Sequence, residues 1–149
     1  LYSGLSVEDN LMMGAYTRKD RKKIKEDLDW IYTVIPRMKE RRKQLAGTLS
    51  GGEAQMCAIS RGLMAAPRLL MIDELSLGLA PVMVDDLIVI LKTVHTERGI
   101  TILLVDQDVQ TALEIASSGY VVVDGRVEHS GPSADLLANP NIQKAYLGI

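Results

Sequence analysis

The sequence is poor in cysteine, in long apolar runs and in net charge. Cys57 is the only cysteine among 149 residues, which excludes an intramolecular disulfide framework and is typical of a reducing, cytosolic compartment. No apolar run reaches the roughly 18 residues that a membrane-spanning helix needs. The formal net charge is −2, which argues against a dedicated nucleic-acid-binding protein. The content of 47% hydrophobic and 24% charged residues is typical of a globular chain that buries a core.

Charge is distributed unevenly along the chain. Residues 18–43 contain eleven Lys and Arg against five acidic residues, whereas the remainder contains six basic and fourteen acidic residues. The acids within residues 18–43 are interspersed, which favours a solvated helix face over a membrane-surface or nucleic-acid patch. The asymmetry predicts a basic, helical N-terminal region of residues 1–66 and a second region of residues 67–149.

Hydrophobic periodicity predicts helices in the first region. Ser6 is a candidate N-cap, with acids in the turn that follows it. Ile24, Leu28, Ile31 and Ile35 recur at spacings of four, three and four, which marks one apolar face of a helix over residues 18–35. Pro36 is expected to end that helix.

The second region alternates short apolar runs with helical stretches. Strands are predicted over residues 68–72, 100–105, 120–123 and 126–129, the last two joined by a hairpin turn at Asp124-Gly125. Helices are predicted over residues 52–65, 81–98 and 109–117. Strands this apolar, alternating with helices, predict an α/β fold with a mainly parallel sheet and flanking helices that cover both of its faces.

The segment Leu49-Ser50-Gly51-Gly52-Glu53 carries the strongest motif. Ser50 and Glu53 have the spacing of a capping box, which predicts the start of a helix. Two glycines at a helix N-terminus let backbone N–H groups approach an anion, which the helix dipole also favours. Taken alone, the segment fits an anion-binding site and a well-capped amphipathic helix equally.

Two carboxylates follow the first predicted strand of the second region. Asp73 and Glu74 lie at its C-terminal end, where ligands bind in open α/β sheets. An acid there can hold Mg²⁺ through its water shell, and its neighbour can polarise an attacking water. An isolated Asp-Glu pair most often ends a strand; with the glycine-containing helix start 20 residues upstream, we favour the functional interpretation.

These residues resemble the ATPases of ATP-binding-cassette (ABC) transporters. Residues 49–53 are similar to the signature motif, residues 69–73 to the Walker B strand with Glu74 as the catalytic glutamate, and residues 76–80 to the D-loop. Gln107 stands at the position of the switch histidine. The subunits of branched-chain amino-acid importers are the most similar branch, on the segments 6–11, 35–37, 40–42, 46–48, 77–81 and 145–148.

The sequence departs from the family pattern at four places. No G-x-x-x-x-G-K-[ST] phosphate loop occurs; since the family carries that loop upstream of its signature, we expect the chain to be the C-terminal part of a longer domain and to be inactive alone. Gln107 replaces histidine and Ala80 replaces the D-loop aspartate, both of which match the importer branch. Leu75 replaces a proline after Glu74, which removes a rigid turn.

The resemblance implies an ATP-hydrolysing importer subunit for amino acids, branched-chain ones first, with ATP and Mg²⁺ as cofactors. Two such subunits sandwich two ATP molecules. Leu49, Ser50, Gly51, Gly52 and Glu53 would face the ATP held by the partner subunit, Asp73 would bind Mg²⁺ through water, and Glu74 and Gln107 would be catalytic. The implied partners are a second ATP-binding subunit and membrane permease subunits, with no nucleic acid. The implied location is the cytoplasmic face of the membrane, reached through the permease only.

Two alternatives stay open at this point. The chain could be a noncatalytic interaction module that supplies only the signature motif to a partner ATPase. It could also belong to the ABC-type ATPases of DNA repair or translation, although residues 10–49 leave no room for the long coiled-coil insertion of the repair branch.

Overall fold

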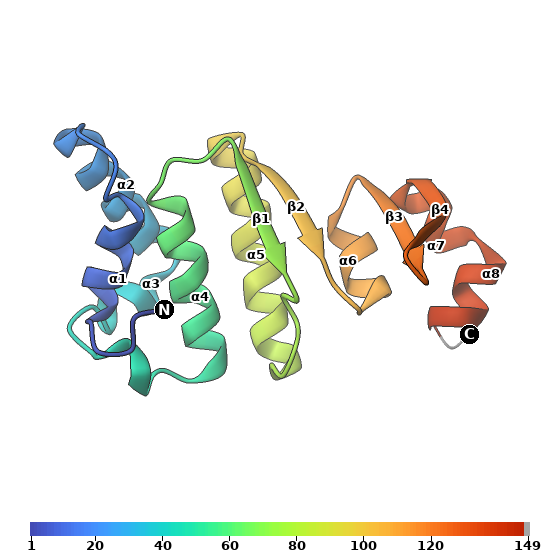
Figure 1. The fold of residues 1–149 in the computed structure, drawn as a ribbon, viewed down its shortest axis with the longest axis horizontal. Helices are drawn as coiled ribbons and strands as arrows, with labels where there is room; N and C mark the ends of the chain where they lie inside the picture. Colours follow the sequence, from blue (N-terminus) through green and yellow to red (C-terminus); the bar gives the residue numbers. More distant parts are fainter. Residues whose placement is uncertain (148–149) are drawn as a thin grey trace. The chain divides into compact units, whose positions relative to one another are not determined.

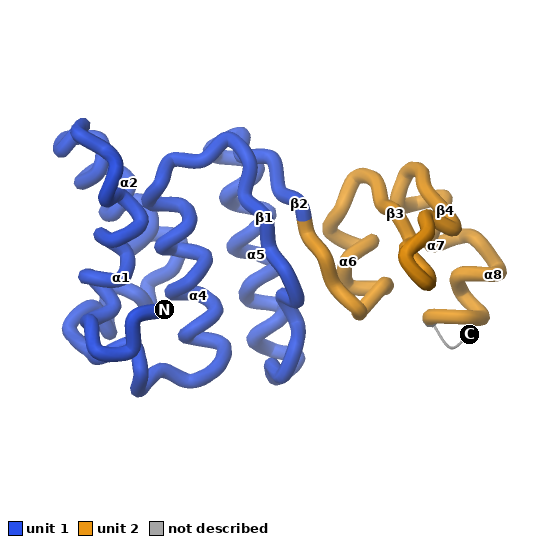
Figure 2. Tube along the Cα trace, in the orientation of Figure 1, with its two compact units in different colours: residues 1–103 blue, residues 104–149 orange. Residues whose placement is uncertain are grey.

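A computed structural model describes residues 1–147 of the chain. The chain forms two compact units, residues 1–103 and residues 104 onward (Figure 2). The predicted boundary at residues 66 and 67 came from charge and periodicity, and it stays a prediction about regions of sequence. No helix within residues 1–147 has the length and apolar character needed to cross a membrane.

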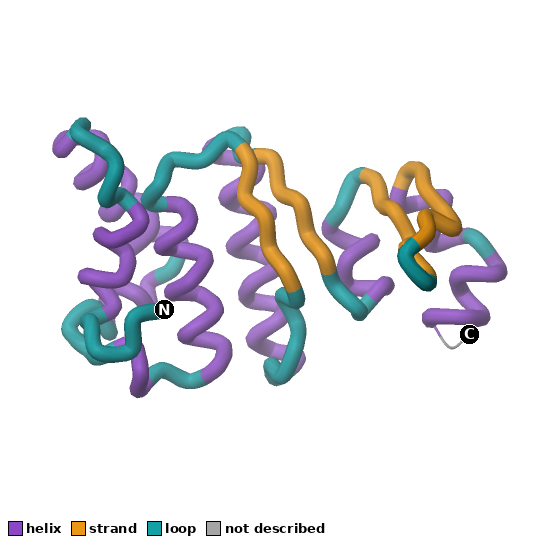
Figure 3. Tube along the Cα trace, in the orientation of Figure 1, coloured by secondary structure: helices purple, strands orange, loops and turns teal. Residues whose placement is uncertain are grey.

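The first unit begins with helices and continues into a strand pair (Figure 1). Its elements are α1 (Val7–Gly14), α2 (Arg21–Val34), α3 (Pro36–Glu40), the 3-10 turn η1 (Ala46–Thr48), α4 (Gly51–Leu63), β1 (Leu69–Asp73), α5 (Pro81–Arg98) and β2 (Thr101–Val105), whose last two residues belong to the second unit. Strands β1 and β2 are neighbours in one two-stranded sheet and run in the same direction, with α5 as the crossover between them (Figures 1 and 3).

Each helix start follows from its sequence. Ser6 caps α1 by accepting the Asp9 N–H at 3.1 Å, as its side chain predicts. Helix α2 starts at Arg21, three residues later than expected, because residues 15–18 form a turn in which the Arg18 N–H donates to the carbonyl of Ala15. Pro36 occupies the first turn of α3, where its missing N–H costs nothing.

The core of the first unit lies where α1 meets α4 and beneath β1. Val7 and Leu11 of α1 are fully buried, and Gly14 lets the two helix backbones approach closely. On the predicted apolar face of α2, Ile24 and Ile31 are buried, whereas Leu28 is half-buried.

The sheet differs from the prediction in how it is covered. Leu70 and Ile72 of β1 are buried, and the Leu70 side chain approaches Gly62 of α4. Alternate residues of the same strand point to the other face, where Leu69 and Met71 are 48% and 71% exposed. Within the described chain, β1 is therefore covered on one face only, because the helices that pack against it lie on the side of Leu70 and Ile72.

The second unit contains α6 (Val109–Ile115), β3 (Ser118–Val123), β4 (Arg126–Pro132), α7 (Ser133–Ala138), α8 (Pro140–Ile142) and the π-helical turn η2 (Gln143–Leu147). Strands β3 and β4 pair antiparallel, with Val123 opposite Arg126. The predicted turn at Asp124-Gly125 is confirmed, with φ of 49° and 74° at these residues. Leu113, Val121, Leu136 and Ile142 form the core of this unit.

Candidate functional site

The start of α4 is a closed capping box. The hydroxyl oxygen of Ser50 accepts the Glu53 N–H at 3.4 Å, and the Glu53 carboxylate accepts the Ser50 N–H at 3.1 Å. The Ser50 hydroxyl also donates to Oε2 of Glu53 at 3.0 Å. The predicted helix start is confirmed, and the hydrogen bonds between Ser50 and Glu53 hold its conformation.

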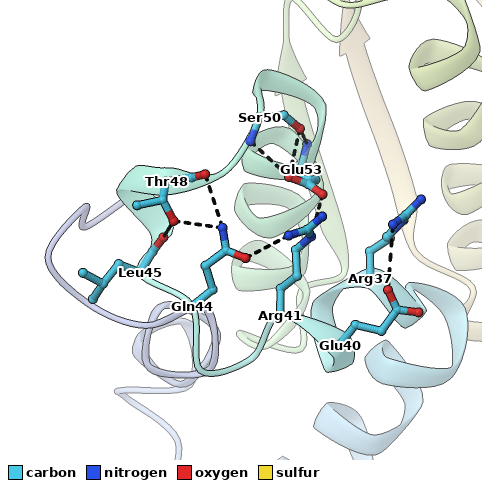
Figure 4. A network of polar contacts seen from close by, with 8 residues as sticks. All are labelled: Arg37, Glu40, Arg41, Gln44, Leu45, Thr48, Ser50 and Glu53. Atoms are coloured by element: carbon cyan, nitrogen blue, oxygen red, sulfur yellow. Dashed lines mark hydrogen bonds and ion pairs between the residues drawn. The ribbon is translucent and has the colours of Figure 1, made fainter.

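A polar network behind the capping box holds the loop that leads into it (Figure 4). The Nε atom of Arg41 lies 2.6 Å from Oε1 of Glu53, in an ion pair that lacks the alignment of a hydrogen bond. The Nη1 group of Arg41 donates a hydrogen bond to Oε1 of Gln44 at 2.9 Å. Gln44 in turn donates to the Thr48 hydroxyl at 2.8 Å and to the Thr48 carbonyl at 3.2 Å. The sequence alone did not indicate Arg41, Gln44 and Thr48 as part of the site. They contact one another and Glu53 across a loop, and such contacts leave no periodic pattern in the sequence.

The two glycines of the helix start have different surroundings. A Cβ on Gly51 would meet only Leu79 Cδ2, at the ordinary contact distance of 3.5 Å, so the space beside this backbone is open. A Cβ on Gly52 would lie 2.5 Å from Met83 Cε, so the absence of a side chain allows α5 to approach. The first N–H groups of a helix have no intrahelical acceptor. Those of Gly51 and Gly52 are therefore available to an anion beside Gly51.

Asp73 and Glu74 end β1 as predicted, and both are exposed. Glu74 has a φ of 54°, a left-handed conformation that is uncommon for a residue with a Cβ. Leu75, directly after it, is fully buried. A proline at position 75 would disfavour this conformation of Glu74, since the residue before a proline prefers extended φ and ψ. Leucine thus imposes no such preference on Glu74, and its side chain is buried in the core directly after the turn.

Gln107 lies in the second unit, in the turn between β2 and α6, and is exposed. Next to it, Asp106 accepts the Asp108 N–H at 2.9 Å, and Asp108 caps α6 by accepting the Thr111 N–H at 3.1 Å. Residues 49–53 thus form one constellation and Asp73 with Glu74 a second, both in the first unit. The assignment of Gln107 to the same chemistry stays a prediction.

Comparison with known proteins identifies the family. The family model described as ABC transporter matches residues 1–76, which include the capping box, the Asp73-Glu74 pair and half of the chain. The chain belongs to the ABC transporter family. This confirms the resemblance that the signature and Walker B segments indicate.

Two curated relatives within the ABC transporter family are similar to nearly the whole of this chain. The chain is 44% identical over 149 residues to the high-affinity branched-chain amino acid transport ATP-binding protein BraG of Pseudomonas aeruginosa, with 99% of this chain aligned. It is 36% identical to the probable branched-chain amino acid transport ATP-binding protein LivF of Archaeoglobus fulgidus, with all of this chain aligned. The chain spans 63% of the length of each relative.

Solved structures agree on the fold. CbiO1 of Clostridium perfringens, part of the ABC transporter complex CbiONQ, superimposes with a TM-score of 0.81 at 23% identity, covering 97% of this chain and 59% of that one. This likeness confirms the α/β fold class.

The residues present fit Mg²⁺ and a nucleotide phosphate at two separate places. Residues 1–147 contain no cluster of three or more His, Cys, Asp and Glu side chains placed to hold a metal. Mg²⁺ requires less, because it keeps several waters and binds through one or two carboxylates together with phosphates. The exposed carboxylate of Asp73 can supply that contact, and the open backbone at Gly51 can supply a phosphate cradle.

The capping box makes the stability of α4 depend on pH. The pKa of the Glu53 carboxyl lies below its usual value, chiefly because the Ser50 N–H donates to it, with the Ser50 hydroxyl and Arg41 acting in the same direction. A carboxyl with a lowered folded-state pKa stabilises the fold above its unfolded pKa of about 4.3. That stabilisation is lost as the pH falls through the folded-state pKa.

We therefore expect Glu53→Gln to be less stable than the wild type at neutral pH, with the difference shrinking as the pH falls below about 4. Urea unfolding at neutral and acidic pH measures it. Glu128→Gln makes the same chemical change at an exposed residue of β4 and is the matched control. A difference between wild type and Glu53→Gln that persists unchanged in acid would contradict the role of the carboxylate charge.

Proposed function

We propose that the chain is part of the ATP-binding and ATP-hydrolysing subunit of an importer for branched-chain amino acids. The observation that carries the proposal is the closed capping box with open backbone at Gly51, in a chain 44% identical to an ATP-binding protein of branched-chain amino acid transport. The relative of Archaeoglobus fulgidus bears a name of the same class.

The start of α4 binds a phosphate rather than performing chemistry. The N–H groups of Gly51 and Gly52 would face the terminal phosphate of an ATP held by a second ATP-binding subunit. The Ser50 hydroxyl would face it too, and would donate to it only by turning its proton away from the Glu53 carboxylate. The positive end of the α4 dipole adds to that attraction. The Glu53 carboxylate is neutralised by Arg41 at 2.6 Å, which keeps its charge from repelling the phosphate.

The end of β1 supplies the hydrolytic groups of this subunit's own nucleotide site. Mg²⁺ would neutralise charge on the transferring phosphoryl group, and Asp73 would hold it through a water molecule. Glu74 would orient and deprotonate the attacking water. Gln107 would donate its amide N–H to a phosphate oxygen; an amide cannot carry a proton away, so its role is that of a sensor.

Hydrolysis in a pair of these subunits would drive permease subunits in the membrane, at its cytoplasmic face. The names of the relatives do not favour the alternative of a noncatalytic module, nor an ABC ATPase of DNA repair or translation.

A pair of variants at Gly51 tests the phosphate contact. Gly51→Asp places a negative charge beside the helix start, whereas Gly51→Asn adds a side chain of the same shape without charge. In both variants the Cβ atom would make only an ordinary contact, at 3.5 Å from Leu79 Cδ2. A unit charge about 5 Å from a phosphate charge costs about 3 kcal/mol at an effective dielectric constant of 20, so the aspartate variant should turn over ATP about 100-fold more slowly than the asparagine variant. Aspartate also suits the first turn of a helix, so the loss would not reflect unfolding.

The measurements are ATP hydrolysis and uptake of leucine, isoleucine and valine by vesicles that contain the complete protein with its permease. Equal ATP turnover in the two Gly51 variants would refute the phosphate contact. ATP-dependent uptake of another solute, with none of these three, would refute the substrate assignment and leave the ATPase assignment standing.

A further inference from the structure

A dense group of cations lies at the start of α2. Lys19, Arg21, Lys22, Lys23 and Lys25, together called the basic patch, fall within seven residues, and all five side chains are exposed. The first turn of α2 contains no acidic residue, so the positive end of the helix dipole adds to these charges.

Two of the acids near the basic patch, Asp20 and Asp27, pair with arginines outside it. Asp20 accepts two hydrogen bonds from Arg18, at 2.9 and 3.1 Å. Asp27, with a side chain 17% exposed, pairs with Arg18 at 2.8 Å and with Arg98 at 3.1 Å. Glu26 reaches Lys22 only at 3.9 Å, with both side chains well exposed. Within residues 1–147 none of the other four cations of the patch is in an ion pair. Asp20 still interacts electrostatically with Lys23, and the exposed Asp29 follows on the same helix, so the interspersed acids offset the patch only in part.

An aromatic side chain precedes the patch in the chain. Tyr16 is 81% exposed in the turn that precedes α2. Tyrosine at the edge of a basic cluster suits the membrane interface, where its ring lies among the headgroups and its hydroxyl stays in water.

We propose that the basic patch binds the anionic headgroups of a lipid bilayer. Clusters of four to eight Lys and Arg near a membrane bind acidic lipids, at about 1 kcal/mol, or roughly fivefold in affinity, for each cation. Four of the five cations are lysines, which are compact point charges on flexible stems. Such side chains suit a fluid layer of charge, whereas recognition of a fixed acidic group favours the rigid fork of arginine.

The charge of the rest of the chain distinguishes binding through the basic patch from attraction by net charge. Outside residues 18–43 acidic residues outnumber basic ones by fourteen to six, and the whole chain has a net charge of −2. Net charge alone would therefore repel the chain from an anionic membrane. Attraction requires a local patch that acts within a screening length of about 10 Å at 0.1 M salt.

Vesicle co-sedimentation of the full chain, without permease, tests the proposal. We expect binding to vesicles of phosphatidylglycerol and phosphatidylcholine, little binding to phosphatidylcholine alone, and loss of binding at high salt. Replacing Lys22, Lys23 and Lys25 with glutamine should lower the partition coefficient about 100-fold. The matched control replaces Lys39, Arg42 and Lys43 with glutamine, since they are also exposed cations of the same unit. This control should lower the partition coefficient less than tenfold.

Three outcomes would overturn the proposal. If the wild-type chain did not bind anionic vesicles, the basic patch would not be a lipid-binding surface. An equal loss in the two triple variants would show attraction to positive charge anywhere in residues 18–43. Binding to heparin or to an acidic permease segment, with none to vesicles, would assign the patch to a different partner. Far-ultraviolet circular dichroism checks that both variants remain folded.

Discussion

Replacing Glu74 with glutamine is expected to reduce ATP hydrolysis by the complete protein about 1,000-fold, the middle of the range for loss of a general base. The amide keeps the size of the side chain but cannot accept a proton from water. Glu74 is exposed after the end of β1 and is not part of the buried core, so the fold should tolerate the change. Steady-state phosphate release measures turnover, and equilibrium binding of a fluorescent ATP analogue measures affinity.

The two measurements separate catalysis from binding. Loss of turnover with nucleotide affinity retained is the expected pattern, because the carboxylate acts on the water and not on the nucleotide. Glu128→Gln, the same change on β4, should leave turnover at the wild-type level. If Glu74→Gln lost affinity and turnover in equal proportion, Glu74 would be a nucleotide-binding group instead of a base.

Gly14→Ala is expected to destabilise the fold by about 3 kcal/mol, near the upper end of the range for overpacking. A Cβ at this position would stand 1.9 Å from the carbonyl oxygen of Arg61 and 2.9 Å from its carbon, both in the backbone of α4. Backbone cannot rotate away as a flexible side chain can, so α1 and α4 would have to separate. That movement would open the contacts of Val7 and Leu11, both fully buried.

The sign of this effect is informative. Alanine normally stabilises a helix over glycine by about 1 kcal/mol, so a net loss would show that the close approach of α1 to α4 outweighs helix propensity. Gly4→Ala is the control, since nothing lies within 4 Å of its Cβ position. Urea unfolding of the three proteins gives the free energies, and a Gly14→Ala variant as stable as the wild type would mean that α1 can shift without cost.

Local rules predicted the elements whose causes are local. The Ser50–Glu53 box, the Asp124-Gly125 turn and the span of α5 from Pro81 to Arg98 all depend on side chains within a few residues of one another. The order of Asp73 and Glu74 after a strand followed from the apolar run before them. In these parts the backbone conformation is set by neighbouring residues and does not depend on contacts with distant segments.

Other parts of the fold depend on contacts between distant residues, which the spacing of residues along the sequence does not reveal. Arg41 reaches Glu53 across a loop, and Gly52 is small because Met83 of α5 lies against it. Leu69 and Met71 were expected to be covered, but apolar character cannot indicate whether another segment reaches a given face of a strand. Glu74 has positive φ although its neighbours give no turn signature, and Leu75 directly after it is fully buried.

The closed capping box also has a thermodynamic consequence for ligand capture. Its hydrogen bonds join Ser50 and Glu53 to each other, and Arg41 holds the carboxylate from behind. The conformational entropy of these side chains is thus lost during folding, not when a phosphate arrives. A preorganised anion site loses less binding free energy to the ordering of its side chains. Association at the start of α4 should therefore resemble docking to a rigid surface, with little induced rearrangement.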